Sequence, residues 1–417
     1  MINTVYFPRF SEILLKEAID ESPVILIHGP RQCGKTTLAK HIGEQLNYDY
    51  ITFDDVTQKN AVIADPVGFV KSLGEYVILD EVQHVPELFS AIKVSVDNNR
   101  KPGRFILTGS TNILLLPKLS DSLAGRVEII RLRPLTLAEV AGKKPTFISN
   151  LFNNNFRESI NQKQYKHLGD ALADIIVTGG YPAAIVRKNQ RSKTRWYRDY
   201  ISTIVQRDVQ DLTKIHKLDI LPRLLVMAAG QTARLFNASE VASPFSVSRP
   251  TIREYLTLLE QVFLIEQLTP WFSNRLSRLI KTPKLHMADT GLACSLLGFN
   301  PQSLWKNREV LGQLLETFVY QELRKYADWQ EIPVNFYHFR NKDKVEVDII
   351  LEQGTQLAGI EVKASATVRS SDFKGLNKLK TACGNDFSAG IVFYDGERIV
   401  PFGDKLFAVP LSLLTPE

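Results

Sequence analysis

The stretch from Gly29 to Thr36 restricts the fold of this chain more than any other part of the sequence. It reads Gly-Pro-Arg-Gln-Cys-Gly-Lys-Thr and fits the pattern G-x-x-x-x-G-K-[ST] of a phosphate-binding loop. An apolar run over 23–28 precedes it, and a helical pattern over 36–46 follows it. Glycine lets such a loop curl around phosphates, and the helix N-terminus that follows attracts anions. The alternative is a glycine-rich turn that matches by chance, but strand, loop and helix in this order favour the phosphate loop.

Strands alternate with helices along the first third of the chain. Further apolar runs occur at 50–55, 76–81, 105–110 and 127–132, and helical patterns at 10–19 and 65–73. This alternation predicts a parallel sheet with helices on both faces. Ligands bind such sheets at the carboxyl ends of the strands. The polar residues that fall at this edge are Lys35, Asp80, Glu81 and Ser110.

These residues suit the chemistry of a nucleoside triphosphate. Lys35 would reach the β- and γ-phosphates, while Thr36 and Asp80 would hold Mg²⁺. Glu81 would polarise the attacking water. A solvated strand end is the alternative for Asp80 and Glu81, and the phosphate loop upstream argues against it. A hydroxyl or amide after the next strand would sense the γ-phosphate, and the sequence leaves the choice open among Ser110, Thr108 and Asn112.

Phosphoryl transfer also requires positive charge near the γ-phosphate, because negative charge spreads over its oxygens. Arg126, in the run Leu-Ala-Gly-Arg at 123–126, is our candidate. It would act within its own chain or across a subunit boundary. A solvated arginine in front of a strand is the alternative.

An ordered set of motifs then extends over most of the chain. The motifs are Gly-Pro-Arg-Gln-x-Gly-Lys-Thr-Thr at 29–37, Leu-Asp-Glu-Val-Gln at 79–83, Thr-Gly-Ser at 108–110, Ala-Gly-Arg at 124–126, Pro-Leu-Thr-Leu-x-Glu at 134–139, Thr-Gly-Gly-Tyr-Pro at 178–182 and Ala-Asp-Thr-Gly-Leu at 288–292. The set resembles the prokaryotic AAA+-like P-loop ATPases of the AAA_14 type that carry a C-terminal DUF4143 region. The resemblance implies ATP binding, ATP hydrolysis and a winged-helix segment in the middle. It does not define a biological role.

A second group of charged residues lies in the last quarter of the chain. Glu316 falls on a predicted helix over 310–326, Asp348 on a strand over 345–351, and Glu361 and Lys363 on a strand over 359–363. Residues two apart leave the same face of a strand. The order is that of the PD-(D/E)xK nuclease fold, in which carboxylates hold Mg²⁺ or Mn²⁺ and the lysine stabilises charge. The fold's usual proline is absent, since Val347 precedes Asp348.

This second interpretation leaves alternatives open. Glu-Val-Lys is also an ordinary amphipathic strand triplet, and only its position after a helix acid and a strand acid favours the nuclease-like fold. Folds of this kind also serve as nucleic-acid-binding platforms without cleavage. We therefore expect a nuclease-like domain and leave its activity open.

The region between these two sites predicts a winged helix-turn-helix. Helical patterns at 221–229, 237–242 and from Ser248 onward precede a basic segment over 271–284. The third helix has Ile252, Tyr255, Leu256, Leu259 and Phe263 on one apolar face and begins with Arg249 and Arg253. The expected wing carries Arg275, Arg278, Lys281 and Lys284. Such arginines contact phosphates or base edges of DNA, but a winged helix also serves as a protein interface or as a lid over nucleotide.

Composition narrows the class of protein. A chain of 417 residues with 44% hydrophobic residues is expected to form two to three domains. The net charge of +6 permits DNA as a partner without requiring it. The distant cysteines Cys33, Cys294 and Cys383 suggest neither a disulfide nor a zinc site. We expect the Cys33 thiol to be exposed to oxidants, which favours a reducing compartment. With no signal peptide or membrane span in the sequence, we expect a soluble cytoplasmic protein.

The expected fold class is α/β. It comprises a P-loop NTPase domain over 1–145, a helical region over 146–218, a winged helix over 219–300 and a smaller restriction-endonuclease-like domain over 301–417. The residues expected to bind ATP are Gly29, Pro30, Arg31, Gln32, Cys33, Gly34, Lys35, Thr36, Thr37, Asp80 and Ser110. The expected catalytic residues are Glu81, Arg126 and Lys363. The expected metal ligands are Thr36 and Asp80 at the first site, and Glu316, Asp348 and Glu361 at the second.

The sequence predicts an ATPase whose nucleotide state controls a DNA-binding winged helix and a nuclease-like domain, with Mg²⁺ at the first site and Mg²⁺ or Mn²⁺ at the second. A homo-oligomer is compatible with this hypothesis. Two alternatives stay open: an ATP-switched regulatory module without nuclease activity, and a DNA-stimulated ATPase motor.

Overall fold

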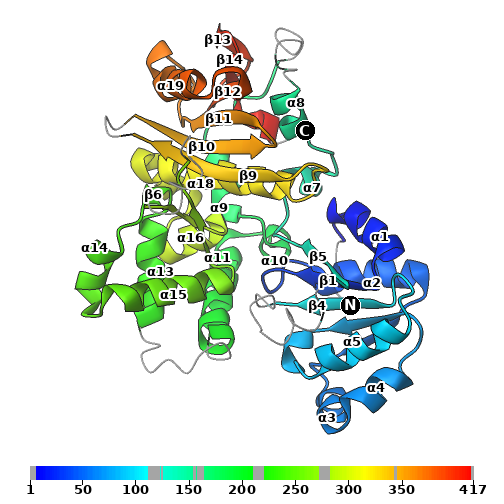
Figure 1. Cartoon of the computed structure of the whole chain (residues 1–417). Coiled ribbons are helices and arrows are strands. Elements are labelled where there is room, and N and C mark those ends of the chain that lie inside the picture. Colours follow the sequence, from blue (N-terminus) through cyan, green and yellow to red (C-terminus); the bar gives the residue numbers. More distant parts are fainter. Residues whose placement is uncertain are drawn as a thin grey trace. The chain divides into compact units, whose positions relative to one another are not determined.

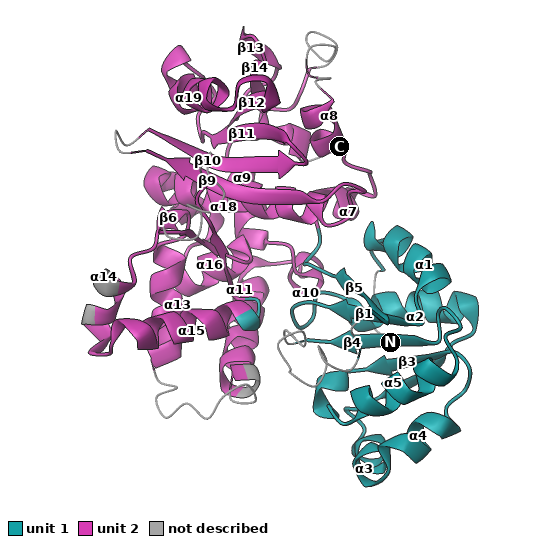
Figure 2. Ribbon diagram, in the orientation of Figure 1, with its two compact units in different colours: residues 1–135, 261–263 teal, residues 136–260, 264–417 magenta. Residues whose placement is uncertain are grey.

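The computed structural model describes residues 6–110, 123, 125–153, 156, 164–209, 220–271, 282–341 and 345–414. The chain forms two compact units (Figure 2). Unit 1 comprises residues 1–135 and 261–263, and unit 2 comprises residues 136–260 and 264–417. Apart from residues 261–263, the three later segments expected from the sequence fall within unit 2, as do residues 136–145 of the expected first domain. Within the described residues, no helix combines the length and the apolar character needed to cross a membrane.

Unit 1 is built on a five-stranded sheet with the order β2-β3-β4-β1-β5, of which Figure 1 labels β4, β1 and β5. The strands are β1 (Val24–His28), β2 (Asp49–Thr52), β3 (Val77–Asp80), β4 (Phe105–Gly109) and β5 (Val127–Arg131). All of them pair in parallel, which confirms the predicted sheet. Val24 pairs with both Phe105 and Val127, so β1, β4 and β5 begin at one edge of the sheet and end at the other.

Both faces of this sheet are buried. The helices of unit 1 are α1 (Ser11–Glu21), α2 (Lys35–Leu46), α3 (Val56–Ala64), α4 (Pro66–Ser72) and α5 (Leu88–Asn98), with a 3₁₀ turn η1 (Val82–His84). Val24 and Leu26 of β1 belong to the apolar cluster that includes α5, whereas Ile25 and Ile27 belong to the cluster that includes α1 and α2. Alternate residues of a strand face opposite sides, so β1 is apolar throughout because it is covered twice.

The first part of unit 2 is mainly helical. Its helices are α7 (Leu137–Ala141), α8 (Phe147–Phe152), α9 (Ala171–Thr178), α10 (Pro182–Ile185), α11 (Gln190–Thr203), the π-helical turn η3 (Ile204–Asp208), α13 (Ile220–Gly230), α14 (Ala238–Ala242), the 3₁₀ turn η4 (Ser243–Phe245), α15 (Arg249–Gln261), α16 (Thr290–Leu297) and α17 (Pro301–Lys306). A three-stranded antiparallel sheet follows the order β6 (Arg234–Leu235), β8 (Lys284–Met287), β7 (Ile265–Leu268). The predicted apolar face of α15 is buried, and the Ser248 hydroxyl accepts from Thr251 N at 3.3 Å as a cap.

Two glycine motifs, at 178–182 and 288–292, meet at one buried carboxylate. Asp289 accepts hydrogen bonds from Gly180 N at 2.7 Å, Leu292 N at 3.0 Å and the Tyr197 hydroxyl at 3.0 Å. A Cβ added to Gly179 would lie 2.4 Å from Asp289 Oδ1, and one added to Gly291 would lie 2.4 Å from the Tyr197 hydroxyl. The glycines are therefore required by close packing, and both motifs hold the helical part of unit 2 together.

The last part of unit 2 is a six-stranded mixed sheet with the order β13-β14-β12-β11-β10-β9 (Figure 1). Its elements are α18 (Arg308–Ala327), β9 (Val334–Arg340), β10 (Glu346–Gln353), β11 (Gln356–Val362), η6 (Ser370–Phe373), α19 (Lys374–Cys383), η7 (Gly384–Asp386), β12 (Phe387–Tyr394), β13 (Val400–Gly403), β14 (Leu406–Pro410) and η8 (Leu411–Leu414). The strands predicted around 334–339, 345–351, 359–363 and 389–394 are confirmed. β11 pairs with β12 in parallel, and α19 provides the crossover that a parallel pair requires.

Helix α8 and the residues after it pack against this distant sheet. The Phe147 ring lies 5.0 Å from the Phe393 ring, and the Ser388 hydroxyl donates to Phe152 O at 3.2 Å. The Asp395 carboxylate accepts from Leu168 N at 2.8 Å and from Gly169 N at 3.0 Å. Residues more than 220 positions apart are thus joined in one core.

We predict that unit 2 loses stability in mild acid because of His286. The ring is fully buried in β8, stacks on Tyr320 at 4.3 Å and lies 3.1 Å from the Thr317 hydroxyl. Burial, followed by the neighbouring Lys284 ammonium, lowers the pKa of His286 from 6.5 to about 3. The unfolded chain therefore binds more protons than the folded chain between these values, and the free energy of unfolding falls as the pH falls.

The measurement is urea unfolding at pH 6.5 and pH 4.5 of the wild type and His286→Phe, which keeps a stacked ring. We expect the wild type to lose about 2–3 kcal/mol more than the variant over this range. Parallel pH dependence in the two proteins would contradict a neutral buried imidazole.

Candidate nucleotide-binding site

The loop after β1 has a backbone that only its particular residues tolerate. A Cβ added to Gly29 would lie 1.9 Å from Leu132 O, so no larger residue fits there. Gln32 and Gly34 have φ angles of 58° and 107°. Helix α2 begins directly afterwards at Lys35. This tight loop at a helix N-terminus is the geometry of an anion-binding cradle.

Lys35 lies inside this loop. Its side chain is only 4% exposed, and its ammonium donates to Gly29 O at 3.0 Å and to Pro30 O at 2.8 Å. These two carbonyls satisfy the charge in the present conformation. Phosphate oxygens would be stronger acceptors because they carry charge, so the ammonium is placed to exchange these carbonyls for a bound phosphate.

Asp80 lies next to the loop, at the carboxyl end of β3, and three hydroxyl groups hold it. Thr36 donates to Asp80 Oδ1 at 2.8 Å, Tyr50 donates to Oδ2 at 2.7 Å, and Thr108 donates to Oδ1. Burial and the Asp80 carboxylate raise the pKa of Tyr50, so its hydroxyl remains a donor. A hydroxyl and a carboxylate in contact are oxygen ligands of the kind that Mg²⁺ prefers, so Thr36 and Asp80 fit the expected metal.

Glu81 follows Asp80 in a left-handed conformation with φ of 57°. Its carboxylate accepts from the Gln83 amide and, at 3.2 Å, from the Ser110 hydroxyl. Gln83 Nε2 in turn donates to Ser110 Oγ at 3.0 Å. The structure thus brings Ser110 and Thr108 to the two carboxylates, whereas Asn112 lies outside the described residues.

Arg9, which belongs to no predicted motif, stabilises the phosphate loop through hydrogen bonds to backbone carbonyls. Its guanidinium donates to Cys33 O at 2.8 Å and to Arg133 O at 2.6 Å, and its side chain is buried. Cys33 is fully buried, with its thiol 3.3 Å from Leu132 O, and burial raises the pKa of that thiol. The expectation of a Cys33 exposed to oxidants is therefore wrong, because the side chain points into the core.

Arg126 lies at the other end of the sheet. It directly precedes β5, whose first residue pairs with the first residue of β1, and its guanidinium binds Asp97 at 2.7 and 3.0 Å. The five residues of β5 separate Arg126 from the edge of the sheet where the phosphate loop lies. At the usual rise per strand residue this is a distance of about 16 Å. The structure does not bring Arg126 to the phosphate loop of its own chain.

Two other arginines lie at the correct edge and were missed from the sequence. Arg131 pairs with His28 at the end of β5, and Arg133 follows it. Burial first, then the charges of Arg131, Lys35 and Arg133, lower the pKa of His28 to about 3. Both arginines therefore contribute positive potential beside the loop. No motif marks them in the sequence, because only the strand register places them here.

The second predicted site is also assembled, with one addition. Glu316 on α18, Asp348 in an irregular stretch of β10, Glu361 near the end of β11 and Lys363 just after it lie together. Lys284, expected in an exposed basic wing, is instead the first residue of β8 and is buried between two of these acids. Its ammonium lies 2.8 Å from Glu316 Oε1 and 3.1 Å from Asp348 Oδ1. Lys284 lies in the strand that pairs with β7, where a wing strand is expected, but its burial removes it from the basic surface that would contact DNA. The other three basic residues of the expected wing lie outside the described part.

This donor set does not fit the divalent metal that a nuclease-like fold implies. An ammonium group already fills the space between two of the three expected carboxylate ligands. Among the residues that the structure describes, no three or more histidine, cysteine, aspartate or glutamate side chains are arranged to hold a metal ion.

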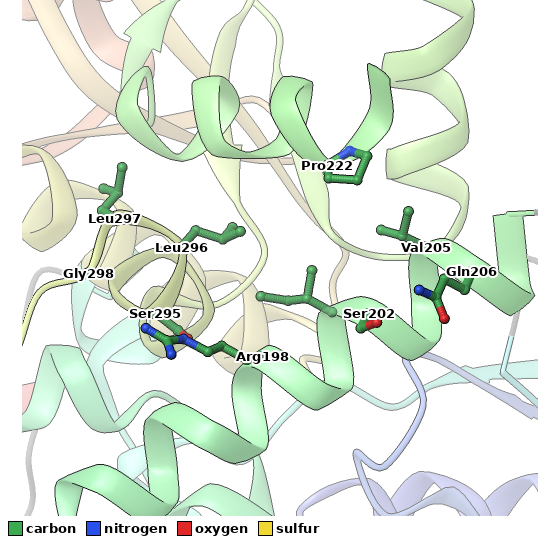
Figure 3. A pocket seen from close by; sticks show the side chains of 10 residues that line it. Arg198, Ser202, Val205, Gln206, Pro222, Ser295, Leu296, Leu297 and Gly298 are labelled. Atoms are coloured by element: carbon green, nitrogen blue, oxygen red, sulfur yellow. The ribbon is translucent and has the colours of Figure 1, made fainter. Parts of the chain in front are cut away.

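A separate pocket of 490 Å³ opens in the helical part of unit 2 (Figure 3). It is lined by the end of α11, the π-helical turn, the start of α13 and the end of α16. Arg198, Ser202 and Gln206 contribute polar groups, and Leu296 is among its apolar residues. It contains none of the predicted site residues.

Comparison with family models divides the chain into three parts. Residues 21–141 match a model described as an AAA domain. Residues 169–303 match DUF8612 and residues 311–414 match DUF4143, both domains of unknown function. The AAA match includes the phosphate loop and Asp80, so unit 1 is an AAA-type P-loop ATPase domain.

Among solved structures, the chain is similar to a Walker-type ATPase of Pyrococcus abyssi, with 14% identity and a TM-score of 0.40 over 70% of this chain and 96% of that one. It is also similar to the RuvB Holliday junction branch migration motor of Thermotoga maritima, with 16% identity and a TM-score of 0.30 over 61% of this chain and 88% of that one. These likenesses are too low to bear on function.

Two whole-chain relatives are uncharacterized proteins of Mycobacterium tuberculosis and Mycobacterium bovis. Each is 30% identical over 399 residues, which is 95% of this chain and 82% of the relative. The chain therefore belongs to the family of these mycobacterial proteins.

Proposed function

We propose that the chain hydrolyses ATP at the phosphate loop and uses its nucleotide state to control contact with DNA. The observation that carries the ATPase proposal is the convergence of Lys35, Thr36 and Asp80 at one edge of the sheet. In this proposal the loop from Gly29 to Thr37 holds the phosphates, and Thr36 and Asp80 hold Mg²⁺. The metal ion, when bound, neutralises charge on the β- and γ-phosphate oxygens.

Glu81 is the proposed base for the attacking water. Its carboxylate is held by Gln83 and Ser110, at the strand end next to Thr108. Ser110 is the proposed sensor of the γ-phosphate, because its hydroxyl already bonds the residue that would accept the proton. A change at the phosphate would thus alter the position of Glu81.

Arg126 remains a proposal only as a residue supplied by another copy of the chain. Its guanidinium would have to leave Asp97 to reach a phosphate. Loss of such an arginine lowers the rate of phosphoryl transfer strongly, because the guanidinium offsets negative charge in the transition state. A homo-oligomer is part of this proposal.

DNA contact is proposed for the region around α15. The elements α13, β6, α14, α15, β7 and β8 follow one another in the order of a winged helix. Arg249 and Arg253 are exposed on the first turns of α15, where a recognition helix meets DNA. The C-terminal order of helix, three strands, helix and strand supports a nuclease-like fold as a further binding platform.

Replacement of the loop lysine provides the first test. Lys35→Ala should lower ATP turnover by about 100-fold or more, because it removes a buried positive charge from the phosphates. The measurement is phosphate release with Mg²⁺, with and without duplex DNA. Lys71→Ala, an exposed lysine on α4, serves as the control. Unchanged turnover in Lys35→Ala would show that ATP is not hydrolysed at this loop. Strong stimulation of turnover by DNA would favour the motor alternative.

Replacement of Tyr50 tests how Asp80 is positioned. Tyr50→Phe removes one of the three hydroxyl donors to this carboxylate, so we expect the Mg²⁺ concentration for half-maximal turnover to rise about 10-fold. Tyr48→Phe is a matched control, since its hydroxyl donates to Gly103 O at 2.5 Å and does not contact Asp80. Equal Mg²⁺ dependence in the two variants would show that the Tyr50 contact is dispensable.

The DNA contact is tested by salt dependence. Arg249→Ala and Arg253→Ala should each weaken duplex binding and lower the slope of log K against log salt by roughly one, because each loses a phosphate contact. Fluorescence anisotropy over a range of salt concentrations measures both quantities, with Lys71→Ala again as the control. Affinity and slope equal to those of the wild type would exclude α15 as the DNA-contacting helix.

A further inference from the structure

Lys284 connects two parts of unit 2 that the sequence suggests are separate. It begins β8 of the three-stranded sheet, and its ammonium reaches Glu316 on α18 and Asp348 on β10. The residue is 4% exposed, and the side chains of Glu316 and Asp348 are 14% and 10% exposed. An ion cluster of this kind is therefore largely removed from water.

Burial of so many charges requires compensation within the cluster. Burial favours a neutral Asp348, but Lys284, Lys363 and the hydrogen bond from Val362 N outweigh it and lower the pKa of this carboxyl. Burial followed by repulsion from Asp348 raises the pKa of Glu361 well above its usual value. Burial opposes the charge of Lys284, yet Glu316 and Asp348 together raise its pKa. The ammonium and the Asp348 carboxylate therefore stabilise each other in their charged forms.

We propose that Lys284 is the resident cation of this carboxylate cluster and occupies the position that a divalent metal ion would need. Its Nζ atom lies 2.8 Å from Glu316 Oε1 and 3.1 Å from Asp348 Oδ1, so it bridges acids from two different elements that a metal ion at this place would have to ligate. A divalent ion between the same oxygens would lie a few ångströms from the ammonium, and like charges at such distances repel strongly in a buried site. The cluster therefore excludes metal while Lys284 is in place.

Lys363 does not share this role. Its side chain is 37% exposed, and its Nζ atom lies 3.6 Å from Glu361 Oε2. It stands beside one acid of the cluster, whereas Lys284 stands between two. Removal of either lysine subtracts the same charge from the chain, but only the loss of Lys284 vacates the space between Glu316 and Asp348.

The consequence is a latent metal site. Without the ammonium, the buried side chains of Glu316 and Asp348 would lose the cation that they share, and a divalent cation could take its place. This inference does not depend on ATP hydrolysis, because the cluster and the phosphate loop share no residue. Turnover and metal exclusion can therefore fail separately.

The experiment measures Mn²⁺ binding to the full chain in the absence of nucleotide. Electron paramagnetic resonance detects the concentration of free Mn²⁺. All proteins carry Asp80→Asn, so that the phosphate-loop site contributes equally. We expect neither this background nor Lys363→Ala to bind Mn²⁺ at the cluster. We expect Lys284→Ala to bind Mn²⁺ at least about 10-fold more tightly than the background protein does. Adding Asp348→Asn to Lys284→Ala should abolish the gain, and Lys284→Arg should still exclude the ion.

Two results would overturn the proposal. One is a folded Lys284→Ala protein, verified by circular dichroism, that binds Mn²⁺ no better than the background. The other is Mn²⁺ binding by the background protein that Asp348→Asn abolishes, since a metal would then share the cluster with Lys284. This second comparison does not require Lys284→Ala to fold. If that variant is unfolded, absence of an Asp348-dependent Mn²⁺ site in the background supports the proposal.

Discussion

A carboxylate that leaves water must receive hydrogen-bond donors or a counter-ion, and three buried aspartates show how this chain meets that constraint. Asp289 receives backbone N–H groups and a tyrosine hydroxyl, and it binds two distant motifs together. Asp80 receives three hydroxyl groups. Asp348 receives an ammonium and one N–H group. The kind of donor decides what each aspartate can still do.

The contrast between Asp80 and Asp348 separates the two charged sites. Neutral hydroxyl donors orient Asp80 without cancelling its charge, so this carboxylate can still attract a cation. Lys284 supplies a full positive charge to Asp348, so this carboxylate attracts a second cation only weakly. Two sites that look alike as sequence patterns of acids and lysines therefore differ in chemistry. The difference originates in Lys284, which the sequence pattern does not connect to either site.

Local periodicity predicted much of the fold. The apolar runs that became β1, β3 and β4 are buried on both faces, and the stripe on α15 is buried as expected. The phosphate loop could also be predicted, because its glycines and lysine must be adjacent in sequence. Tyr50, Arg9 and Arg133 could not be predicted, because they reach the site through strand register and long side chains. The acid partners of Lys284 could not be predicted for the same reason, since they lie 32 and 64 residues later in the chain.

The packing of α8 against the C-terminal sheet has a consequence for how the chain is made. Phe152 and Leu168 find their partners Ser388 and Asp395 only after more than 220 further residues have left the ribosome. Contacts this distant in sequence form slowly, and the apolar surface that awaits them is exposed meanwhile. Unit 1 comprises residues 1–135 and only three later residues, 261–263, so it can fold early. The nascent chain would therefore carry a folded ATPase domain while α8 still waits for its sheet.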